Sequence, residues 1–471
     1  MAYSATDKAI SFFRPYNHTG TGSSGTVTDV GFTPDMFWHK NRANNQGHGL
    51  IDSVRGNSNY ISPNTTNAQL SDVGAYGITS GGFTFPNGDA FFNGSGNQII
   101  FWSWLMGGTA PTKTYTVKVV SDSGNKFRFD DFGTSAVTLD LQEGGTYTFD
   151  ASDSTNSSHP FVLGTSSGVD GSYSTGVTYK LDGVTKTYSQ YTSGYSSATS
   201  RQLIITVAAS APTLYYNCSV HSGMGGAINT NTTFGSSNFD GTLQSTVSVN
   251  TTAGFSIIRY TGNATNSTVG HGLGATPDLI LVKNLISSGG SAEHWRAQHN
   301  EVSASNVLYL NRDVAQDSNG DFQSTYPTSS SFSISSADGC NKSGEAHIVY
   351  CFTSKTGYSK FGSFTGNNSA SSGPFVYTGF KPVFHIIKRY DVANDWNLQS
   401  HEMTKNGIDK ALQANSNTAE LVNGGYKVDK LSNGFKMREA GSETNADGGL
   451  YIYMAIGQTL VGSNNVPATA Q

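Results

Sequence analysis

The chain has 471 residues and a formal net charge of −5. Charged residues make up 13% of it, against about 25% in an average globular protein, while aromatic residues reach 11% and Gly contributes 55 residues. The aromatic content excludes a disordered chain, the abundance of turn-forming residues disfavours helical bundles, doubly wound enzymes and coiled coils, and the negative charge disfavours nucleic-acid binding.

The N-terminal segment and the cysteine content bear on where the protein folds. Residues 1–14 lack a charged region followed by an apolar one, so no secretory signal is predicted. The longest apolar stretch, residues 99–106, is far shorter than the roughly 20 residues of a membrane helix. Three cysteines give no disulfide framework. We therefore expect folding in a reducing cytoplasm, without membrane insertion.

Three segments of the chain share one order of features, which begins with a proline opening an apolar run that ends in lysine. The three runs span residues 34–40, 277–283 and 382–388. Each segment continues through a second apolar element and a Phe that follows a turn, and it closes with an apolar strand. The closing strands are centred on Ile100, Ile348 and Ile452, which lie 66, 71 and 70 residues after the three prolines. Such matching offsets indicate an internal repeat.

The lysine that ends each run occupies a repeated position. These residues are Lys40, Lys283 and Lys388. A lysine at the end of a strand usually lies in solvent, so we expect three solvated strand ends rather than ligand-binding groups.

The spacing of the repeats reveals an inserted domain. The second and third prolines are 105 residues apart, whereas the first and second are 243 apart, an excess of 138 residues. The excess falls at about residues 111–231, where segments such as 115–120, 145–149 and 203–207 alternate apolar and polar residues, as strands do. Helix signals are nearly absent, and the best candidate is the short segment 407–414.

We therefore predict an all-β protein of four parts, in which tandem β-sandwich, jelly-roll-like modules accompany one domain of a different kind. The predicted modules are residues 1–109 (repeat 1), 234–356 (repeat 2) and 357–471 (repeat 3), and the inserted domain is residues 112–231.

The inserted domain contains a set of residues that suits copper. Cys218, His221 and Met224 lie on one short segment, and His159 lies 59 residues before the cysteine. Two imidazoles and a soft thiolate hold copper in a trigonal plane, with a weak thioether on the axis, and this arrangement suits both oxidation states. The alternative is that these residues only pack, because Cys is often a small buried hydrophobe.

The same residues make this domain similar to the cupredoxins, a family of Greek-key sandwiches, over about residues 114–230. The spacing of Cys218, His221 and Met224 resembles that of amicyanin, the approach segment 214–218 resembles that of plastocyanin, and His159 corresponds to the first copper ligand. The resemblance implies a cupredoxin-like fold and a possible type 1 copper site. A sandwich of this kind also persists as a spacer without metal, since fold does not determine function.

The three repeats resemble a module of virion structural proteins of tailed bacteriophages, especially marine ones. The resemblance rests on segments such as 239–248, 357–367, 373–382 and 445–455. It implies a structural or adhesive role and no reaction. Low charge and abundant Tyr, Ser, Gly and Asn also suit adaptable contacts with sugars or proteins.

Catalysis is not expected. A polysaccharide depolymerase needs paired carboxylates, one with a raised pKa, and the candidates Asp130, Asp131 and Glu439 lack the aromatic residues that mark a sugar cleft. No nucleophile elbow, phosphate loop or His-Glu-x-x-His motif is present.

The sequence thus predicts a non-enzymatic bacteriophage virion protein, assembled in the host cytoplasm, that forms a tail fibre or similar appendage for host attachment. By analogy with fibres we expect a homo-oligomer, as a trimer, with other virion proteins and a host surface glycan or protein as partners. The alternatives are a capsid-attached decoration or fibre protein and a copper-binding electron-transfer protein of the cupredoxin type.

Overall fold

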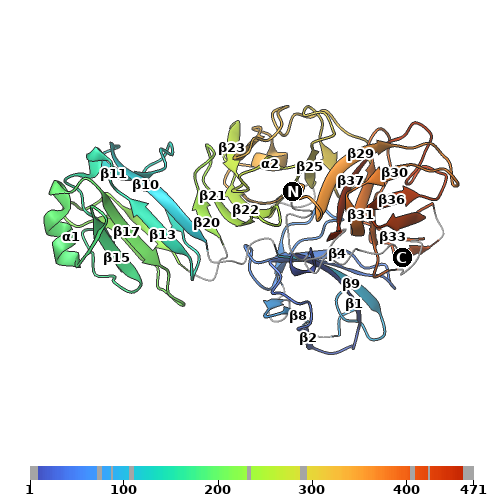
Figure 1. Ribbon diagram of the computed structural model, residues 1–471, viewed down its shortest axis with the longest axis horizontal. Coiled ribbons are helices and arrows are strands. Elements are labelled where there is room, and N and C mark those ends of the chain that lie inside the picture. The colour runs from blue at the N-terminus through green and yellow to red at the C-terminus, as the bar shows by residue number, and fades with distance from the viewer. Residues whose placement is uncertain are drawn as a thin grey trace. The chain divides into compact units, whose positions relative to one another are not determined.

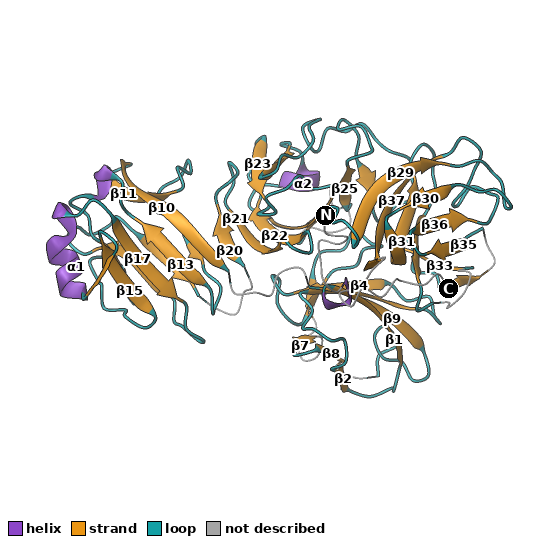
Figure 2. Ribbon diagram, viewed as in Figure 1, coloured by secondary structure: helices purple, strands orange, loops and turns teal. Residues whose placement is uncertain are grey.

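The structure is a computed structural model that describes residues 9–71, 77–85, 88–105, 111–230, 235–286, 294–403, 409–422 and 425–459. Strands dominate this part of the chain, and its two α-helices are the short α1 (Tyr188–Gly194) and α2 (Asp338–Asn341) (Figure 2). The predicted all-β fold class is confirmed. None of the helices described is both long and apolar enough to cross a membrane.

The chain divides into two compact units. Unit 1 combines Met1–Gly108 with Val249–Gln471, and unit 2 is Thr109–Ser248. Unit 1 therefore holds repeats 1 and 3 and most of repeat 2. Unit 2 contains the predicted insertion at residues 112–231 and also residues 234–248 of the predicted repeat 2.

Unit 2 contains two sheets with an aromatic core. The first sheet has the order β11-β10-β13-β17-β15-β16 and the second has the order β12-β19-β18-β14. The strands of the first are β10 (Thr112–Ser121), β11 (Asn125–Phe129), β13 (Thr146–Asp150), β15 (Val177–Leu181), β16 (Val184–Lys186) and β17 (Arg201–Thr206). The strands of the second are β12 (Leu139–Asp140), β14 (Phe161–Gly164), β18 (Leu214–Cys218) and β19 (Gly226–Asn229). Every second residue of β13 is buried, as the alternating sequence predicts, and rings such as Phe129, Phe149, Phe161 and Tyr216 pack between the strands.

The three repeats of unit 1 have the same strand order in their larger sheets (Figure 1). Repeat 1 has β1 (Phe13–Thr19), β9 (Gln98–Trp104), β3 (Met36–Asn41) and β4 (His48–Asp52), in that order across the sheet. Repeat 2 has β22 (Phe255–Thr261), β28 (Ala346–Phe352), β24 (Leu279–Asn284), β25 (Arg296–His299) and β26 (Leu308–Tyr309), and its sheet continues beyond β22 with β21 (Ser245–Asn250) and β20 (Ser236–Asn238). Repeat 3 has β29 (Ser359–Thr365), β37 (Leu450–Thr459), β31 (Phe380–Arg389), β32 (Trp396–Ser400), β33 (Lys410–Gln413) and β34 (Leu421–Val422).

Each repeat also has a smaller antiparallel sheet. Repeat 1 has β2 (Gly25–Val27), β8 (Gly82–Phe85) and β7 (Gly77–Thr79), and a separate pair β5 (Asn59–Tyr60) and β6 (Leu70–Ser71). Repeat 2 has β23 (Ser267–Gly270) and β27 (Ser331–Ile334), and repeat 3 has β30 (Phe375–Tyr377), β36 (Gly434–Met437) and β35 (Val428–Leu431). The equivalence is exact in register, because Val27, Val269 and Val376 pair with Phe83, Phe332 and Phe435 respectively.

The larger sheets are buried on both faces, which explains their continuous apolar runs. In β3, Met36 and Trp38 enter a core cluster that contains residues of all three repeats, whereas Phe37 enters a local cluster with the smaller sheet of repeat 1. In β31, Phe384 and Ile386 likewise face the shared core. The three larger sheets therefore surround one common core.

Three sets of equivalent hydrogen bonds join the repeats in a closed cycle. In the first set, an imidazole or indole N–H at the start of β4, β25 or β32 donates to a main-chain carbonyl of a neighbouring repeat. The pairs are Trp295 Nε1 to Ser62 O at 3.0 Å, Trp396 Nε1 to Tyr309 O at 2.9 Å, and His48 Nε2 to Gln413 O at 2.9 Å. In the second set, a main-chain N–H seven residues after each of these carbonyls donates back. The pairs are Gln69 N to Leu285 O at 2.9 Å, Gln316 N to Tyr390 O at 2.9 Å, and Glu420 N to Arg42 O at 2.8 Å. Repeat 1 thus contacts repeat 2, repeat 2 contacts repeat 3, and repeat 3 contacts repeat 1.

The repeated lysines form the third set, and the expectation that they lie in solvent is wrong. Lys40, Lys283 and Lys388 are at most 1% exposed. Each reaches a carbonyl four residues after the acceptor of the first set: Lys40 Nζ to Asn417 O at 3.3 Å, Lys283 Nζ to Thr66 O at 3.5 Å, and Lys388 Nζ to Asp313 O at 3.3 Å. Burial lowers the pKa of Lys40 and of Lys388 to about 8. A strand end that would be solvated in an isolated module is covered here by the next repeat.

The predicted helical segment 407–414 is also wrong where the structure describes it. Residues 407–408 lie outside the described residues, and Lys410–Gln413 form β33, which lies between β32 and β34 in the larger sheet. Ala411, Leu412 and Ala414 are buried there. Packing against the common core outweighs the helix propensity of this short segment.

Candidate metal centre

Strand pairing in unit 2 brings the predicted copper ligands to one end of the second sheet. Phe161, the first residue of β14, pairs with Cys218, the last residue of β18. The contact extends one step further, because Ser219 N donates to Pro160 O at 3.0 Å. His159, just before β14, therefore lies beside the segment that follows β18 and carries His221.

The three side chains form a compact triangle of ligand atoms. His159 Nδ1 and His221 Nδ1 are 3.0 Å apart, and Cys218 Sγ lies 3.9 Å from the first and 3.6 Å from the second. A point in the plane of these atoms lies about 2 Å from each of them, which is the bond length that imidazole and thiolate ligands give to first-row metals. Among the residues that the structure describes, this is the group of His, Cys, Asp or Glu side chains close enough to hold a metal ion.

The site is asymmetric in its exposure. Cys218 is fully buried and His159 is 8% exposed, while His221 lies at the surface. Burial raises the pKa of the Cys218 thiol, and burial together with the neighbouring His221 lowers the pKa of His159. The His159 imidazole is therefore favoured in the neutral form that binds metals, whereas the Cys218 thiol must lose its proton when a metal binds.

Residues around the triangle position its side chains and the segment that carries them. The side-chain amide of Asn125, on β11, lies 3.5 Å from His159 Nε2, so it can fix the ring with Nδ1 turned toward the cysteine. Lys126 Nζ donates to the carbonyl of Gly223 and ties the ligand segment to the first sheet. Gly225 must be a glycine, because a Cβ there would lie 1.6 Å from Tyr216 O.

Met224, the predicted axial ligand, lies on the same segment. It is 2% exposed and belongs to the core cluster that contains Cys218. Its main-chain carbonyl accepts a hydrogen bond of 2.9 Å from Phe127 N, which anchors the end of the segment. The structure thus brings His159, Cys218 and His221 together and places Met224 in the adjoining core.

Sequence reasoning missed Asn125. It lies 34 residues before His159 on a strand of the other sheet, and nothing in its local sequence marks it. Only the pairing and packing of the two sheets bring it to the imidazole.

Asp130 and Asp131, two of the three acidic residues considered for catalysis, use their carboxylates in contacts within the fold. Asp130 and Asp131 have φ angles of 48° and 57°, as turn residues often do. Asp130 accepts a hydrogen bond of 2.8 Å from Thr116 N, and Asp131 pairs with Lys118 and Arg128 at the surface. Glu439 accepts from Asn445 Nδ2 through its main-chain carbonyl.

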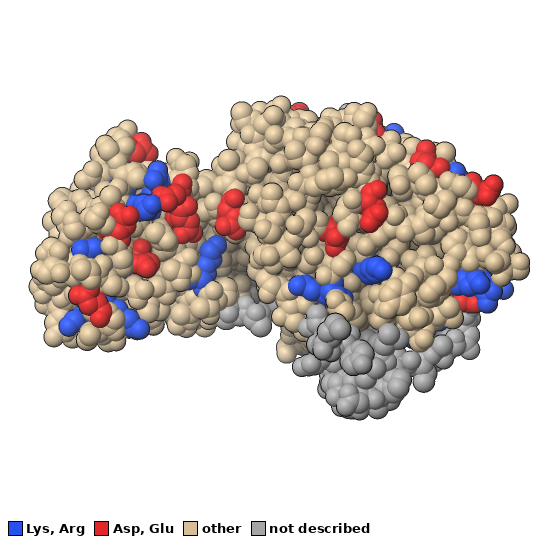
Figure 3. Space-filling view, turned by 45° about the horizontal axis from the view of Figure 1, so that its top comes forward, with Lys and Arg blue, Asp and Glu red and all other residues tan. Residues whose placement is uncertain are grey.

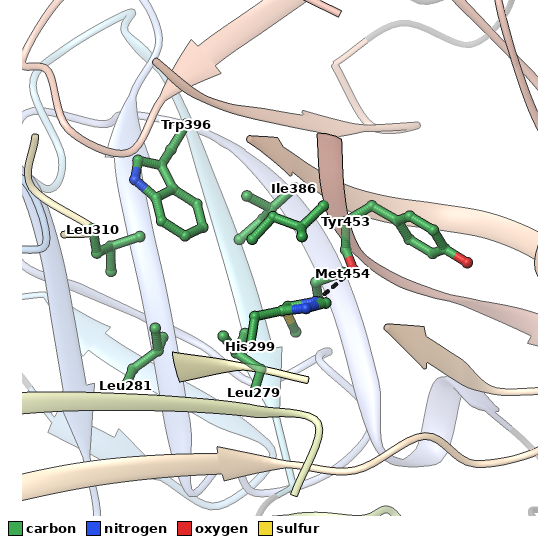
Figure 4. Close-up of a pocket in the computed structure, with 9 residues that line it drawn as sticks. Leu279, Leu281, His299, Leu310, Ile386, Trp396, Tyr453 and Met454 are labelled. Carbon is green, nitrogen blue, oxygen red and sulfur yellow. Dashed lines mark hydrogen bonds between the residues drawn. The ribbon is translucent and has the colours of Figure 1, made fainter. Parts of the chain in front are cut away.

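Unit 1 contains an apolar cavity between repeats 2 and 3 (Figure 4). Its volume is about 20 Å³, enough for one water molecule at most. Its lining residues are Leu279, Leu281, His299, Leu310, Ile386, Trp396, Ile452, Tyr453 and Met454. The polar edge of His299 is turned to Tyr453 O, at 3.4 Å (Figure 4). The cavity is too small for a ligand.

A family model described as a domain of unknown function, DUF7483, matches residues 8–135 and 228–459. The match includes the three repeats and leaves out residues 136–227, where His159, Cys218, His221 and Met224 all lie. No curated protein and no solved structure matches the chain. Since the match extends over more than half of its length, the chain belongs to the DUF7483 family.

Proposed function

We propose that this protein is a structural protein of a bacteriophage virion, a tail fibre or comparable surface appendage that contributes to host attachment. The resemblance of the repeats to virion modules suggests the setting. The observation that supports the role most strongly is the closed cycle of hydrogen bonds between the three repeats. A capsid-attached decoration is the alternative location for the same scaffold.

The cycle supports an appendage because the three repeats of one chain pack together as three separate subunits of an oligomer would. Fibres are commonly trimers, and a closed symmetric oligomer joins its subunits through equivalent interfaces. Here a lysine, a ring N–H and a main-chain N–H of each repeat donate to carbonyls of another repeat, so the scaffold closes within a single chain. Such a scaffold holds surface loops rigidly, which suits repeated contact with other virion proteins and with a host surface.

A competition experiment tests the attachment role. Particles that contain this protein are mixed with host cells in the presence of the purified full chain. We expect the adsorption rate to fall by at least tenfold at a saturating concentration of the chain, because the chain occupies the receptor. Serum albumin at the same concentration is the control. An adsorption rate that stays constant at saturation contradicts a role in receptor binding.

Copper binding in unit 2 is the second candidate function, and the triangle of His159, Cys218 and His221 favours it. Copper held by such ligands supplies reversible transfer of one electron. The residues of the chain would supply two imidazoles and a thiolate, with Met224 available on the same segment and Asn125 orienting His159. His221 is the exposed edge of the site, whereas burial of Cys218 excludes water from the thiolate.

A further inference from the structure

We propose that Phe375 and Tyr377 form a binding platform for an acidic polysaccharide on the smaller sheet of repeat 3. Both residues are on β30, with Val376 between them pointing into the core. Phe375 is 46% exposed and Tyr377 is 56% exposed. Alternate residues of a strand share a face, so the two rings lie side by side on the outer surface of the sheet. The inference builds on the proposed attachment role by naming the class of ligand.

Each of the two rings lies close to a glycine. A Cβ at Gly434, which pairs with Tyr377, would lie 3.0 Å from two ring carbons of Phe375, so the Phe375 ring lies over this glycine. A Cβ at Gly379 would lie 3.6 Å from the Tyr377 hydroxyl, so this ring passes close to a second glycine. Rings supported in this way lose little conformational freedom on binding a ligand.

The other two repeats show that the fold does not need aromatic residues here. Repeat 1 has Thr26 and Thr28 at the positions of Phe375 and Tyr377, and repeat 2 has Thr268 and Gly270. The glycine beneath the platform does not require a covering ring either. Repeat 1 has Gly82 at the position of Gly434, and the closest atoms to its Cβ position are main-chain atoms of residues 27 and 28. The aromatic pair is therefore specific to repeat 3.

Positive charge flanks the platform. Lys436 pairs with Phe375 across the strands, and Lys360 Nζ lies 5.4 Å from the centre of the Tyr377 ring and donates to Tyr377 O at 2.7 Å. The nearby carboxylate of Asp429 is already paired with Arg438. Figure 3 shows how sparse charged side chains are on the face that it displays, and the whole chain is negative. The two exposed rings therefore have a lysine beside each of them.

These features fit a polymer of acidic sugars. The apolar C–H face of a sugar ring packs on an aromatic ring, as other apolar groups do, and the tyrosine hydroxyl offers a polar edge to sugar hydroxyls. The two lysines complement carboxylate or sulfate groups on the same polymer. Single-stranded nucleic acid also stacks on aromatic rings, but such sites follow the backbone along a positively charged groove. Two flanking lysines on a negative chain favour the polysaccharide.

Affinity electrophoresis of the full chain in native gels tests the proposal, with alginate as the acidic polysaccharide and dextran as the neutral one. We expect alginate to retard the wild-type chain and dextran to leave its mobility unchanged. The double variant Phe375→Thr, Tyr377→Thr has the residues of repeat 1 at both positions, so it should fold normally. We expect its affinity for alginate to fall at least tenfold. Lys436→Gln should weaken binding severalfold and reduce the dependence of binding on salt.

Tyr326→Thr is the matched control, since Tyr326 is 49% exposed in repeat 2 and lies outside the platform. It should bind alginate as the wild type does. Equal affinity of the double variant, equal retardation by dextran, or binding of oligo-dT in place of alginate would each overturn the proposal. If the double variant melts at a lower temperature than the wild type, Lys436→Gln decides the result. A chain that competes for adsorption but does not bind alginate contradicts this inference alone, whereas one that binds alginate without competing contradicts the attachment role.

Discussion

Addition of Cu(II) to the full chain is expected to produce an intense visible charge-transfer band, and Cys218→Ser is expected to abolish it. The band arises when a thiolate binds Cu(II) directly, and Cys218 Sγ is the sulfur in the triangle with His159 Nδ1 and His221 Nδ1. A serine hydroxyl is a hard, weakly acidic ligand that does not replace a thiolate. We expect a stoichiometry of one copper per chain for the wild type.

The other two cysteines provide the matched control. Cys340 and Cys351 lie buried in unit 1, and burial raises the pKa of Cys340 to about 12. Cys340→Ser should therefore keep the full intensity of the band. Because Cys218 must lose its proton on binding, the affinity for copper should rise with pH while the thiol is protonated in the free protein. A colourless wild-type protein at saturating Cu(II), or an unchanged band in Cys218→Ser, would contradict the copper site.

Unit 1 is expected to unfold at mildly acidic pH, because it buries several histidines in the neutral form. Burial lowers the pKa of His48 to about 3 and that of His299 and His347 to about 4. Burial also holds the pKa of His39 and of His385 well below the usual value.

Hydrogen bonding explains why these rings resist protonation. Trp38 Nε1 donates to His48 Nδ1 at 2.9 Å while His48 Nε2 donates to Gln413 O, so a second ring proton would face the indole donor. His299 is bonded in the same way, accepting from Glu301 N at 3.2 Å and donating to Tyr453 O.

The direction of the pH effect follows from the protonation of these histidines in the folded and in the unfolded chain. In the unfolded chain an imidazole binds a proton at about pH 6.5, whereas the folded rings stay neutral to lower pH. Proton binding therefore favours the unfolded chain. The stability of the folded chain is highest above about pH 6.5, and it falls as the pH falls toward 4. Each unit of pKa shift is worth about 1.4 kcal/mol, so several such groups together approach the whole free energy of unfolding of a domain, about 5–15 kcal/mol.

Differential scanning calorimetry between pH 7 and pH 4 tests this prediction. The transition of unit 1 should move to a much lower temperature over this range, and that of unit 2 should move less. His299→Gln should reduce the proton uptake on unfolding by about one, because the folded ring stays neutral to about pH 4. A melting temperature of unit 1 that is independent of pH in this range would be the contrary result.

The sequence predicted the fold class and the repeats because both depend on patterns that a chain carries locally. Alternating residues and turns indicate strands, and equal offsets indicate equivalent strands. The burial of Lys40, Lys283 and Lys388 could not be predicted in this way. A lysine after an apolar run is normally solvated. Only the cyclic packing of the three larger sheets brings a carbonyl of another repeat to each ammonium group.

The candidate metal centre, too, could be predicted from the sequence only in part. Cys218 and His221 are three residues apart, so the sequence alone shows that they share a segment. The expectation that His159 joins them came from the ligand set that copper prefers and from the resemblance to cupredoxins, and the pairing of Phe161 with Cys218 now gives its physical basis. Asn125 could not be found without the packing of the two sheets.

The location of this chain in an image reconstruction of the particle tests the central claim most directly. The proposal predicts density for the chain on the outside of purified virions, with unit 1 recognisable as three equivalent larger sheets around one core. Its presence on the tail would support the fibre, and its presence on the shell would support the decoration. A complete reconstruction without this density, with the chain found only in the particle-free fraction of the lysate, would contradict the account.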